Sequence, residues 1–308
     1  MNKLEFPRGW WLIAASDELK PKKPLALKRF GLDLVLWRAQ NGQIHAVKDL
    51  CPHRSIKLSL GKVTEDCIEC PFHGLRYAGN GECQFVPEVE KAAPQIKVAS
   101  FHVVEFESYL WLWWDEINSH AAPQGTPQWF DGLPKKALTI EQTDQAQCHV
   151  TRAIENQLDF NHLSFVHRRS IGRFSDPRKI PYFKLEEESL QYAMSKELDK
   201  PPYIAFKLPN IWLNAISPRF MMTLGFTPID QNTTQFYMRT YQNFLPIPLL
   251  GHFLMLILRR TNRWVLGEDL RIVNSHPEGQ SLDFDSYEKL LGTDRAIRHF
   301  RTIWKKVK

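Results

Sequence analysis

Two cysteines and two histidines in the first third of the chain have the spacing of a metal site. Cys51 and His53 form a C-x-H pair, and Cys70 and His73 form a C-x-x-H pair after 16 intervening residues. Two thiolates and two imidazoles can bind one zinc ion, or they can hold a [2Fe-2S] cluster with the thiolates on one iron and the imidazoles on the other. Two loops that each offer one thiolate and one imidazole favour the cluster, because they can clamp it from both sides.

A zinc ribbon is the competing interpretation of the cysteines. It would use the Cys67-x-x-Cys70 pair together with Cys51 or Cys83, and it leaves both histidines unexplained. The cysteines outside the two pairs, Cys67, Cys83 and Cys148, are therefore predicted to be unligated small core residues. Five cysteines at uneven spacing point to metal ligation or buried thiols in a reducing compartment, rather than to disulfides.

A second group of metal-competent side chains lies in the second half of the chain. Asp159 and His162 are three positions apart on one face of a predicted helix, and His167 follows just over one turn later. A further predicted helix about a hundred residues downstream carries Glu268 and Asp269. Hydrogen bonds and caps can explain each polar group singly. Together, two histidines and a carboxylate fit the facial triad that binds non-haem Fe(II) and leaves positions open for O₂ and substrate.

The elements that must position these residues predict an α+β protein with two domains and a linker. The boundaries are 1–117 for a small all-β domain, 118–138 for a Pro- and Ser-containing linker, and 139–308 for an α+β catalytic domain with an antiparallel sheet. Hairpin strands are predicted over 32–38 and 43–48, with Asn41-Gly42 as a two-residue hairpin signal between them. A second β pair is predicted over 96–104 and 109–114. Helices are predicted over 152–166, 264–274 and 287–307, with strands over 182–244 between them.

Composition places the chain among ordinary globular proteins, with 43% hydrophobic and 24% charged residues. The net charge of +6 is mostly dispersed, so we expect no nucleic-acid partner. We identify no secretory h-region and no segment long enough to cross a bilayer, and we expect a cytoplasmic protein.

The most apolar stretch, 244–258, is a short predicted helix that is too hydrophobic for a solvated surface. Three interpretations stay open: buried core, a flap over the substrate entrance, or an interfacial anchor. With Arg259 and Arg260 directly after it, the anchor would give weak contact with a membrane surface over residues 244–260.

The sequence from Asp49 to Gly61, together with that from Glu69 to Gly81, resembles a Rieske [2Fe-2S] domain. With the second group added, the chain resembles the large (alpha) subunits of Rieske non-haem iron oxygenases, which pair these two domains in this order. It lacks the extra cysteines of the high-potential respiratory branch, and its compact length is similar to vanillate O-demethylase-like monooxygenases. One departure is Leu75, where the hydroxylases often have Trp. The resemblance implies a helix-grip-like catalytic domain.

The resemblance also implies roles for individual residues. The cluster would be held by Cys51, His53, Cys70 and His73, and a mononuclear Fe(II) by His162, His167 and Asp269. Asp269 is favoured over Glu268 because the family pattern is an acidic residue followed by the liganding aspartate. Asp159 would join His162 of its own chain to His73 of a neighbouring subunit, which implies a cyclic homotrimer. Asn156 matches an asparagine near the iron.

The implied reaction is O₂ activation that hydroxylates or oxidatively demethylates a small aromatic or otherwise apolar substrate. No Gly-rich dinucleotide fingerprint is present, so a separate reductase or ferredoxin must supply the electrons. The alternatives are a ring-dihydroxylating dioxygenase, a Rieske electron-transfer protein without catalysis, and a zinc-stabilised interaction module. Candidate pocket walls are the large apolar side chains Phe160, Phe165, Trp212, Phe220, Met221 and Met222.

Measuring the iron, acid-labile sulfide and zinc content of protein purified without oxygen tests the oxygenase, electron-carrier and zinc interpretations. A cluster plus a mononuclear site predicts about three irons and about two acid-labile sulfides per chain. About two of each, unchanged after Fe(II) reconstitution, would leave only an electron carrier. Zinc without sulfide would contradict the Rieske interpretation.

Overall fold

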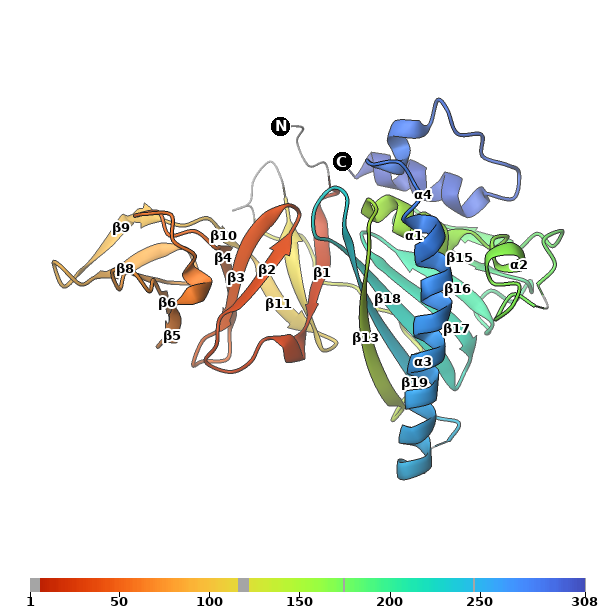
Figure 1. Ribbon diagram of the computed structural model, residues 1–308, viewed down its shortest axis with the longest axis horizontal. Coiled ribbons are helices and arrows are strands. Elements are labelled where there is room, and N and C mark those ends of the chain that lie inside the picture. Colours follow the sequence, from red (N-terminus) through yellow and green to blue (C-terminus); the bar gives the residue numbers. More distant parts are fainter. Residues whose placement is uncertain (1–5, 116–121, 174, 246, 308) are drawn as a thin grey trace. The chain divides into compact units, whose positions relative to one another are not determined.

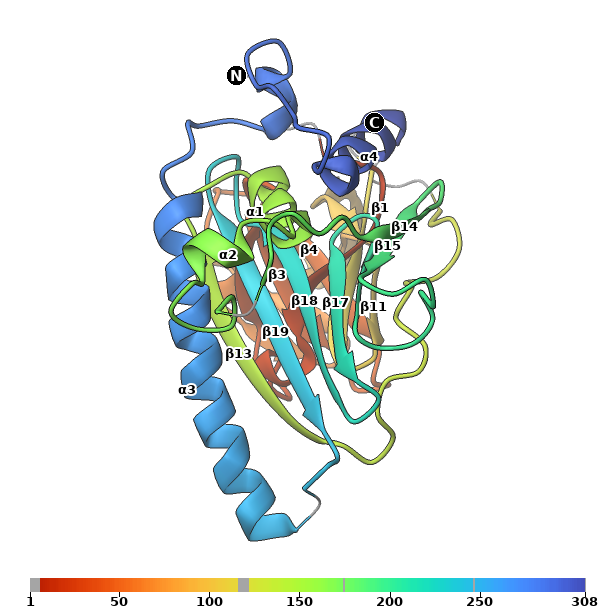
Figure 2. The same cartoon turned by 90° about the vertical axis from the view of Figure 1, so that its right-hand side faces the viewer.

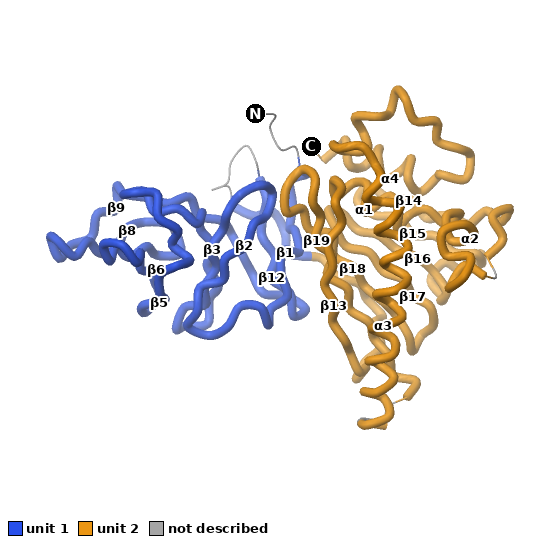
Figure 3. Tube along the Cα trace, in the orientation of Figure 1, with its two compact units in different colours: residues 1–127 blue, residues 128–308 orange. Residues whose placement is uncertain are grey.

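The computed structural model describes residues 6–115, 122–173, 175–245 and 247–307. The chain forms two compact units, residues 1–127 and 128–308 (Figure 3). The division falls within the predicted linker 118–138, of which residues 118–121 lie outside the described residues. Within the described parts, no helix has the length and apolar character needed to cross a bilayer.

The first unit is built from β-strands and two short 3-10 turns, as far as it is described. Its strands are β1 (Gly9–Ala15), β2 (Leu25–Arg29), β3 (Leu32–Arg38), β4 (Ile44–Lys48), β5 (Lys62–Thr64), β6 (Cys67–Glu69), β7 (Arg76–Tyr77), β8 (Glu82–Val86), β9 (Lys91–Lys97), β10 (Ser100–Phe101), β11 (Val103–Phe106) and β12 (Tyr109–Trp114). They form sheets in the orders β1-β12-β11, β10-β4-β3-β2 and β5-β6-β7-β8-β9 (Figure 1). The all-β prediction for this part is confirmed.

Two predicted β pairs differ in detail from the structure. The Gly42 N–H bonds the Ala39 carbonyl oxygen at 3.0 Å, and Gly42 has φ +87°, so the β3–β4 hairpin has a three-residue loop rather than a two-residue one. The strand predicted over 96–104 was wrong as a single strand. Its residues belong to β9, β10 and β11, because they pair with β8, β4 and β12 respectively.

The second unit is an antiparallel sheet with helices packed on it (Figure 2). Its described strands, β13 (Leu138–Ala146), β14 (Tyr182–Leu185), β15 (Ser189–Ala193), β16 (Tyr203–Lys207), β17 (Ile211–Ser217), β18 (Phe220–Pro228) and β19 (Thr234–Gln242), lie in the order β13-β19-β18-β17-β16-β15-β14. The helices are α1 (Val150–Leu158), α2 (Leu163–Val166), α3 (Pro248–Val273) and α4 (Arg295–Lys306), with a 3-10 turn at Ser281–Phe284. The α+β prediction is confirmed.

All four predicted helices have different bounds in the structure. The helix over 152–166 is broken into α1 and α2, because Asp159 Oδ1 accepts the Asn161 N–H at 2.8 Å and replaces the helical pattern with a turn. The helix over 264–274 and the separate short helix over 244–258 are parts of the single 26-residue helix α3. The helix over 287–307 begins only at Arg295, after Asp294 has accepted the Leu291 N–H in a turn.

A buried ion pair joins α4 to α1. Arg301 donates from Nε to Glu155 Oε1 at 2.8 Å and from Nη2 to Glu155 Oε2 at 2.9 Å. Both side chains are largely buried, and Arg301 also binds Asp285 and Glu288. This bidentate geometry holds the last helix against the helix that leads into the metal site.

Replacing Arg301 with alanine should lower the free energy of unfolding by about 3–5 kcal/mol, because the buried Glu155 carboxylate loses its bidentate partner. Among the described residues, only Arg152, whose Nη1 lies 3.8 Å from Glu155 Oε2, then remains as a counter-charge. Equilibrium urea unfolding measures the loss. The exposed Lys306→Ala change on the same helix is the control and should stay within about 0.5 kcal/mol of the parent. A loss below about 1 kcal/mol for Arg301→Ala would contradict the role given to this pair.

Candidate metal centres

The two Cys/His loops of the first unit have the same backbone design. The Cys51 carbonyl accepts the Ser55 N–H at 2.9 Å, and the Cys51 N–H donates to the Ile56 carbonyl at 2.8 Å. In the second loop, the Cys70 carbonyl accepts the Gly74 N–H at 3.0 Å, and the Cys70 N–H donates to the Leu75 carbonyl at 2.8 Å. The loops therefore present their side chains alike.

The ligand side chains of the two loops also meet. The rings of His53 and His73 lie 4.6 Å apart between centroids. Cys51 and Cys70 are buried, whereas His53 is exposed and His73 is half-buried. Buried thiols with imidazoles toward the surface fit a [2Fe-2S] cluster whose His-bound iron lies on the outside.

The two thiols lie in a mostly apolar cluster of buried side chains. The Tyr77 hydroxyl lies 3.3 Å from Cys51 Sγ. Burial raises the pKa of the Cys70 thiol, and its contact with Cys51 raises it further. A Cys70 thiol that resists ionisation fits a site whose thiolates are stabilised by bound iron. Gly74 has φ +71°, a conformation that favours glycine, so the second loop can turn beside the ligands.

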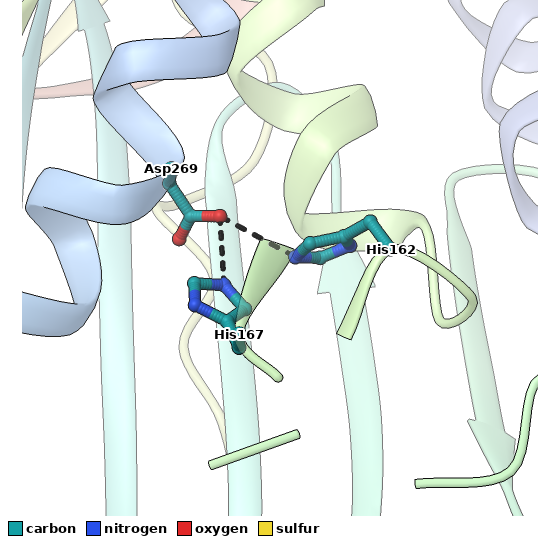
Figure 4. Close-up of side chains that lie close together, drawn as sticks. All are labelled: His162, His167 and Asp269. Carbon is teal, nitrogen blue, oxygen red and sulfur yellow. Dashed lines mark hydrogen bonds and ion pairs between the residues drawn. The ribbon is translucent and has the colours of Figure 1, made fainter. Parts of the chain in front are cut away.

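The second constellation comes together at one point (Figure 4). His162, His167 and Asp269 each offer a ligand atom, and these atoms lie within 4.8 Å of one another. The Nε2 atoms of His162 and His167 lie 3.3 Å and 2.9 Å from Asp269 Oδ1. In the described part of the chain, no other three His, Cys, Asp or Glu residues gather their ligand atoms this closely.

The hydrogen bonds of the two Nδ1 atoms show which ring nitrogen of His162 and His167 carries a proton. His162 Nδ1 lies 2.6 Å from the Asp159 carbonyl oxygen, which can only accept, so this nitrogen carries the proton. His167 Nδ1 lies 2.9 Å from Glu268 Oε2 and donates to that carboxylate. Both Nε2 atoms therefore face Asp269 Oδ1, where each can donate a hydrogen bond to the carboxylate or, without its proton, offer a lone pair to a metal ion. Two imidazoles and one carboxylate that converge in this way can bind a cation, and this ligand set suits non-haem Fe(II).

The carboxylate is held in its ionised form. Burial alone would raise the pKa of Asp269, but hydrogen bonds from His162, His167 and Asn156 lower it well below its ordinary range. Asn156 Nδ2 donates to Oδ1 at 3.0 Å, and Gln157 Nε2 donates to Oδ2 at 3.2 Å. Burial likewise opposes protonation of His167, yet Asp269 and Glu268 together raise its pKa. The site is thus built for a positive charge between these groups.

Asp159 differs from the expected arrangement. Its main-chain carbonyl, rather than its carboxylate, bonds the His162 ring, and its carboxylate accepts the Asn161 and His162 N–H groups. Because Asp159 caps the end of α1, the expectation that it shares one helical face with His162 was wrong. Burial raises the pKa of Asp159.

Three further residues complete the site and had not been assigned to it from the sequence. Glu268 binds His167 Nδ1 and accepts the Ser170 hydroxyl at 2.6 Å, so the adjacent acids divide the work: Asp269 faces the two Nε2 atoms and Glu268 orients one ring. Gln157 fixes the second oxygen of Asp269. Only the acidic pair itself was visible in the sequence, because Gln157 and Ser170 lie in ordinary polar patterns.

A cavity of about 440 Å³ lies against these ligands in the second unit. Of the predicted walls, Phe160, Trp212, Phe220 and Met222 line it. Phe165 is mostly exposed, and Met221 points to the other face of the sheet because successive residues of a strand alternate. Polar side chains from the sheet and α3, Asn214, Thr261 and Asn262, interrupt the apolar lining, and no Lys or Arg of the described residues belongs to it.

The fold and the two donor sets define a two-domain protein with an iron-sulfur site and a separate mononuclear metal site. Residues 9–105 match the family model "Rieske [2Fe-2S] domain", and residues 146–209 match "Vanillate O-demethylase oxygenase C-terminal domain". The chain therefore belongs to the Rieske oxygenases, and the predicted family and cofactors, a [2Fe-2S] cluster and mononuclear iron, are confirmed.

The relatives fit this assignment. The oxygenase component of dicamba O-demethylase from Stenotrophomonas maltophilia is 31% identical over 54% of this chain and 49% of that protein. The 4beta-methylsterol monooxygenase of Methylococcus capsulatus is 27% identical over 84% of this chain and 77% of its own length. The chain thus spans about half the length of the first relative. A crystal structure of dicamba monooxygenase with 3,6-dichlorosalicylic acid has the same fold, with a TM-score of 0.78 at 22% identity over 97% of this chain and 96% of that one.

Glu268→Ala should weaken Fe(II) binding at the mononuclear site about 10- to 100-fold, because His167 loses the carboxylate that orients it and raises its basicity. Anaerobic competition with an Fe(II) chelator measures the change. Glu278→Ala, an exposed acid beyond the same helix, should leave the affinity unchanged. Equal affinities for the two variants would show that Glu268 does not support the ligand.

Proposed function

We propose that this protein is the oxygenase component of a Rieske system that hydroxylates or oxidatively demethylates a small apolar substrate with O₂ and externally supplied electrons. The observation that carries the proposal is the convergence of His162, His167 and Asp269 against an apolar cavity, in a chain that also has a Rieske domain. Iron bound there would activate O₂ next to the substrate.

The proposed ligands follow the two donor sets. Cys51, His53, Cys70 and His73 would hold the cluster, and His162, His167 and Asp269 the mononuclear iron. The matched loops, the ring contact of His53 with His73, and the inward-facing Nε2 atoms support this assignment.

The surrounding residues of the chain position the ligands and the substrate. Asn156 and Gln157 hold both oxygens of Asp269, so this carboxylate stays ionised and fixed in direction. The Asp159 carbonyl keeps the proton of His162 on Nδ1. The apolar walls exclude water from the reacting position, and the Asn214 side chain offers a hydrogen bond to a polar group of the substrate.

An uncharged substrate fits this cavity best. A carboxylate buried there would find no cationic side chain among the described lining residues, and burying an unpaired charge is costly. Among the relatives, the methylsterol monooxygenase is named for a sterol substrate. We therefore propose monooxygenation or demethylation of an uncharged aromatic or alicyclic compound.

The proposed partners are a reductase or ferredoxin, which would deliver electrons to the cluster, and further copies of the chain. A cyclic homotrimer would bring His73 of one subunit to Asp159 of the next, giving the electrons a short path between chains. The free cysteines support a reducing, cytoplasmic setting. We also propose weak membrane-surface contact through residues 244–260.

Two other functions share parts of this site. A ring-dihydroxylating dioxygenase would use the same ligands and differ in its product, which would carry two added hydroxyl groups. An electron-transfer protein would need only the cluster. The ligand set at Asp269 argues against that function, because electron transfer alone does not require a second group of converging ligand atoms beside a cavity.

His162→Ala should reduce product formation to background while the visible spectrum of the cluster stays unchanged, because only the mononuclear ligand set is broken. Oxygen uptake and product analysis, with reduced ferredoxin and a panel of uncharged methoxyarenes and sterols, provide the measurement. The surface change His102→Ala is the control. Parental activity in His162→Ala would remove the mononuclear site from the mechanism.

A further inference from the structure

The first half of α3 carries an exposed apolar surface. Leu249, Phe253 and Leu256 are 88%, 61% and 59% exposed. Helical spacing places them on one stripe, which we call the apolar stripe: Leu249, Leu250, Phe253, Leu256 and Ile257. The opposite side of the helix packs inward, where Met255 is buried. The interpretation of 244–258 as buried core was therefore wrong for this stripe.

The first turns of α3 extend past the end of the sheet in both views (Figures 1 and 2). The stripe therefore belongs to a protruding edge of the second unit. Phe244, which is also exposed, packs its ring against Phe220 of β18 at 5.9 Å between centroids. The exposed apolar surface is in this way continuous with the sheet end.

Basic side chains surround this surface. Exposed Arg259 and Arg260 follow the stripe on α3. At the other flank, Asn243 donates from Nδ2 to the Lys135 carbonyl and from its N–H to the Arg219 carbonyl, which brings these two exposed cations to the same end. No acidic residue occurs between Asp230 and Glu268 in the sequence. We call Lys135, Lys136, Arg219, Arg259 and Arg260 the basic rim.

The cavity reaches the same end of the sheet. Ala193, Tyr203, Ala215 and Met221 stand opposite one another in register across β15 to β18. The lining residues Met194, Pro202, Ile216 and Phe220 adjoin this row, and Ile216 is 39% exposed.

The metal ligands lie at the opposite end of the cavity. On α3, the lining residue Leu258 precedes Asp269 by about three helical turns. The cavity thus runs along α3 from the metal ligands to the edge that carries the apolar stripe.

We propose that this edge docks on a lipid bilayer with anionic headgroups, and that an apolar substrate enters the cavity from the lipid past Ile216. The apolar stripe would enter the acyl boundary while the basic rim meets the headgroups, as in interfacial helices. A second copy docked face to face would oppose two basic rims, which is unfavourable, whereas anionic lipid neutralises them. A second copy docked head to tail is the alternative that the measurement of oligomeric state below tests. The proposed docking is supported by the exposed surface residues alone, whereas the proposed entry route also rests on the proposed function.

Flotation with vesicles of phosphatidylcholine and phosphatidylglycerol tests the docking, using iron-loaded full-length protein. The parent should bind these vesicles and bind vesicles of phosphatidylcholine alone more weakly. Leu249→Glu with Phe253→Glu should lower the partition coefficient at least about tenfold. Arg259→Gln with Arg260→Gln should lower it about fivefold for each arginine lost. The control pair Tyr287→Glu with Leu291→Glu, also strongly exposed, should bind like the parent.

Photo-crosslinking tests the entrance. p-Benzoylphenylalanine in place of Ile216 should form adducts with vesicle lipid, and the same residue in place of Leu291 should not. His162→Ala should bind vesicles and crosslink like the parent even though it forms no product. A failure of catalysis is therefore separable from a failure of docking.

Three results would overturn the proposal. One is no vesicle binding by the parent. Another is a shift of oligomeric state in the Leu249→Glu, Phe253→Glu protein without vesicles, seen by analytical ultracentrifugation, which would make the stripe an interface between copies. The third is vesicle binding without adducts at Ile216, which would remove the lipid entry route.

Discussion

The meeting of two imidazole Nε2 atoms with one carboxylate oxygen of Asp269 is the constraint on which the second unit depends. These three groups meet at one point only if the chain holds each of them in place from behind. The Asp159 carbonyl and Glu268 do this for the rings, and Asn156 and Gln157 do it for the carboxylate. The supporting groups come from α1, the turn after it and α3. The ion pair between Arg301 and Glu155 holds α4 against α1.

Much of the chemistry was predictable from the sequence, because ligand sets leave spacings that few other functions need. The C-x-H and C-x-x-H pairs lie in two loops with matched hydrogen bonds, and the distant Asp269 comes to His162 and His167. Ligands that share a short loop or one helical turn must keep a fixed spacing along the chain, so this spacing can be recognised in the sequence.

The parts that could not be predicted depend on competition between local and tertiary contacts. Helical periodicity continues through Asp159, but its side chain bonds the backbone two residues on and ends α1 there. The periodic pattern of α3 is concealed by its exposed apolar half, since a surface helix is expected to bury its apolar residues. The sequence does not reveal the separate role of Glu268, because it does not show toward which group each of two adjacent acidic side chains points.

The apolar lining of the cavity has a consequence for turnover under the proposed function. Adding oxygen, or uncovering a hydroxyl by removing a methyl group, makes the product more polar than the substrate. A wall with few hydrogen-bonding side chains holds such a product less well than it held the substrate, because the new hydroxyl must give up its water to stay. The reaction itself would then lower the affinity of the cavity for the product. Product release would need no separate conformational change.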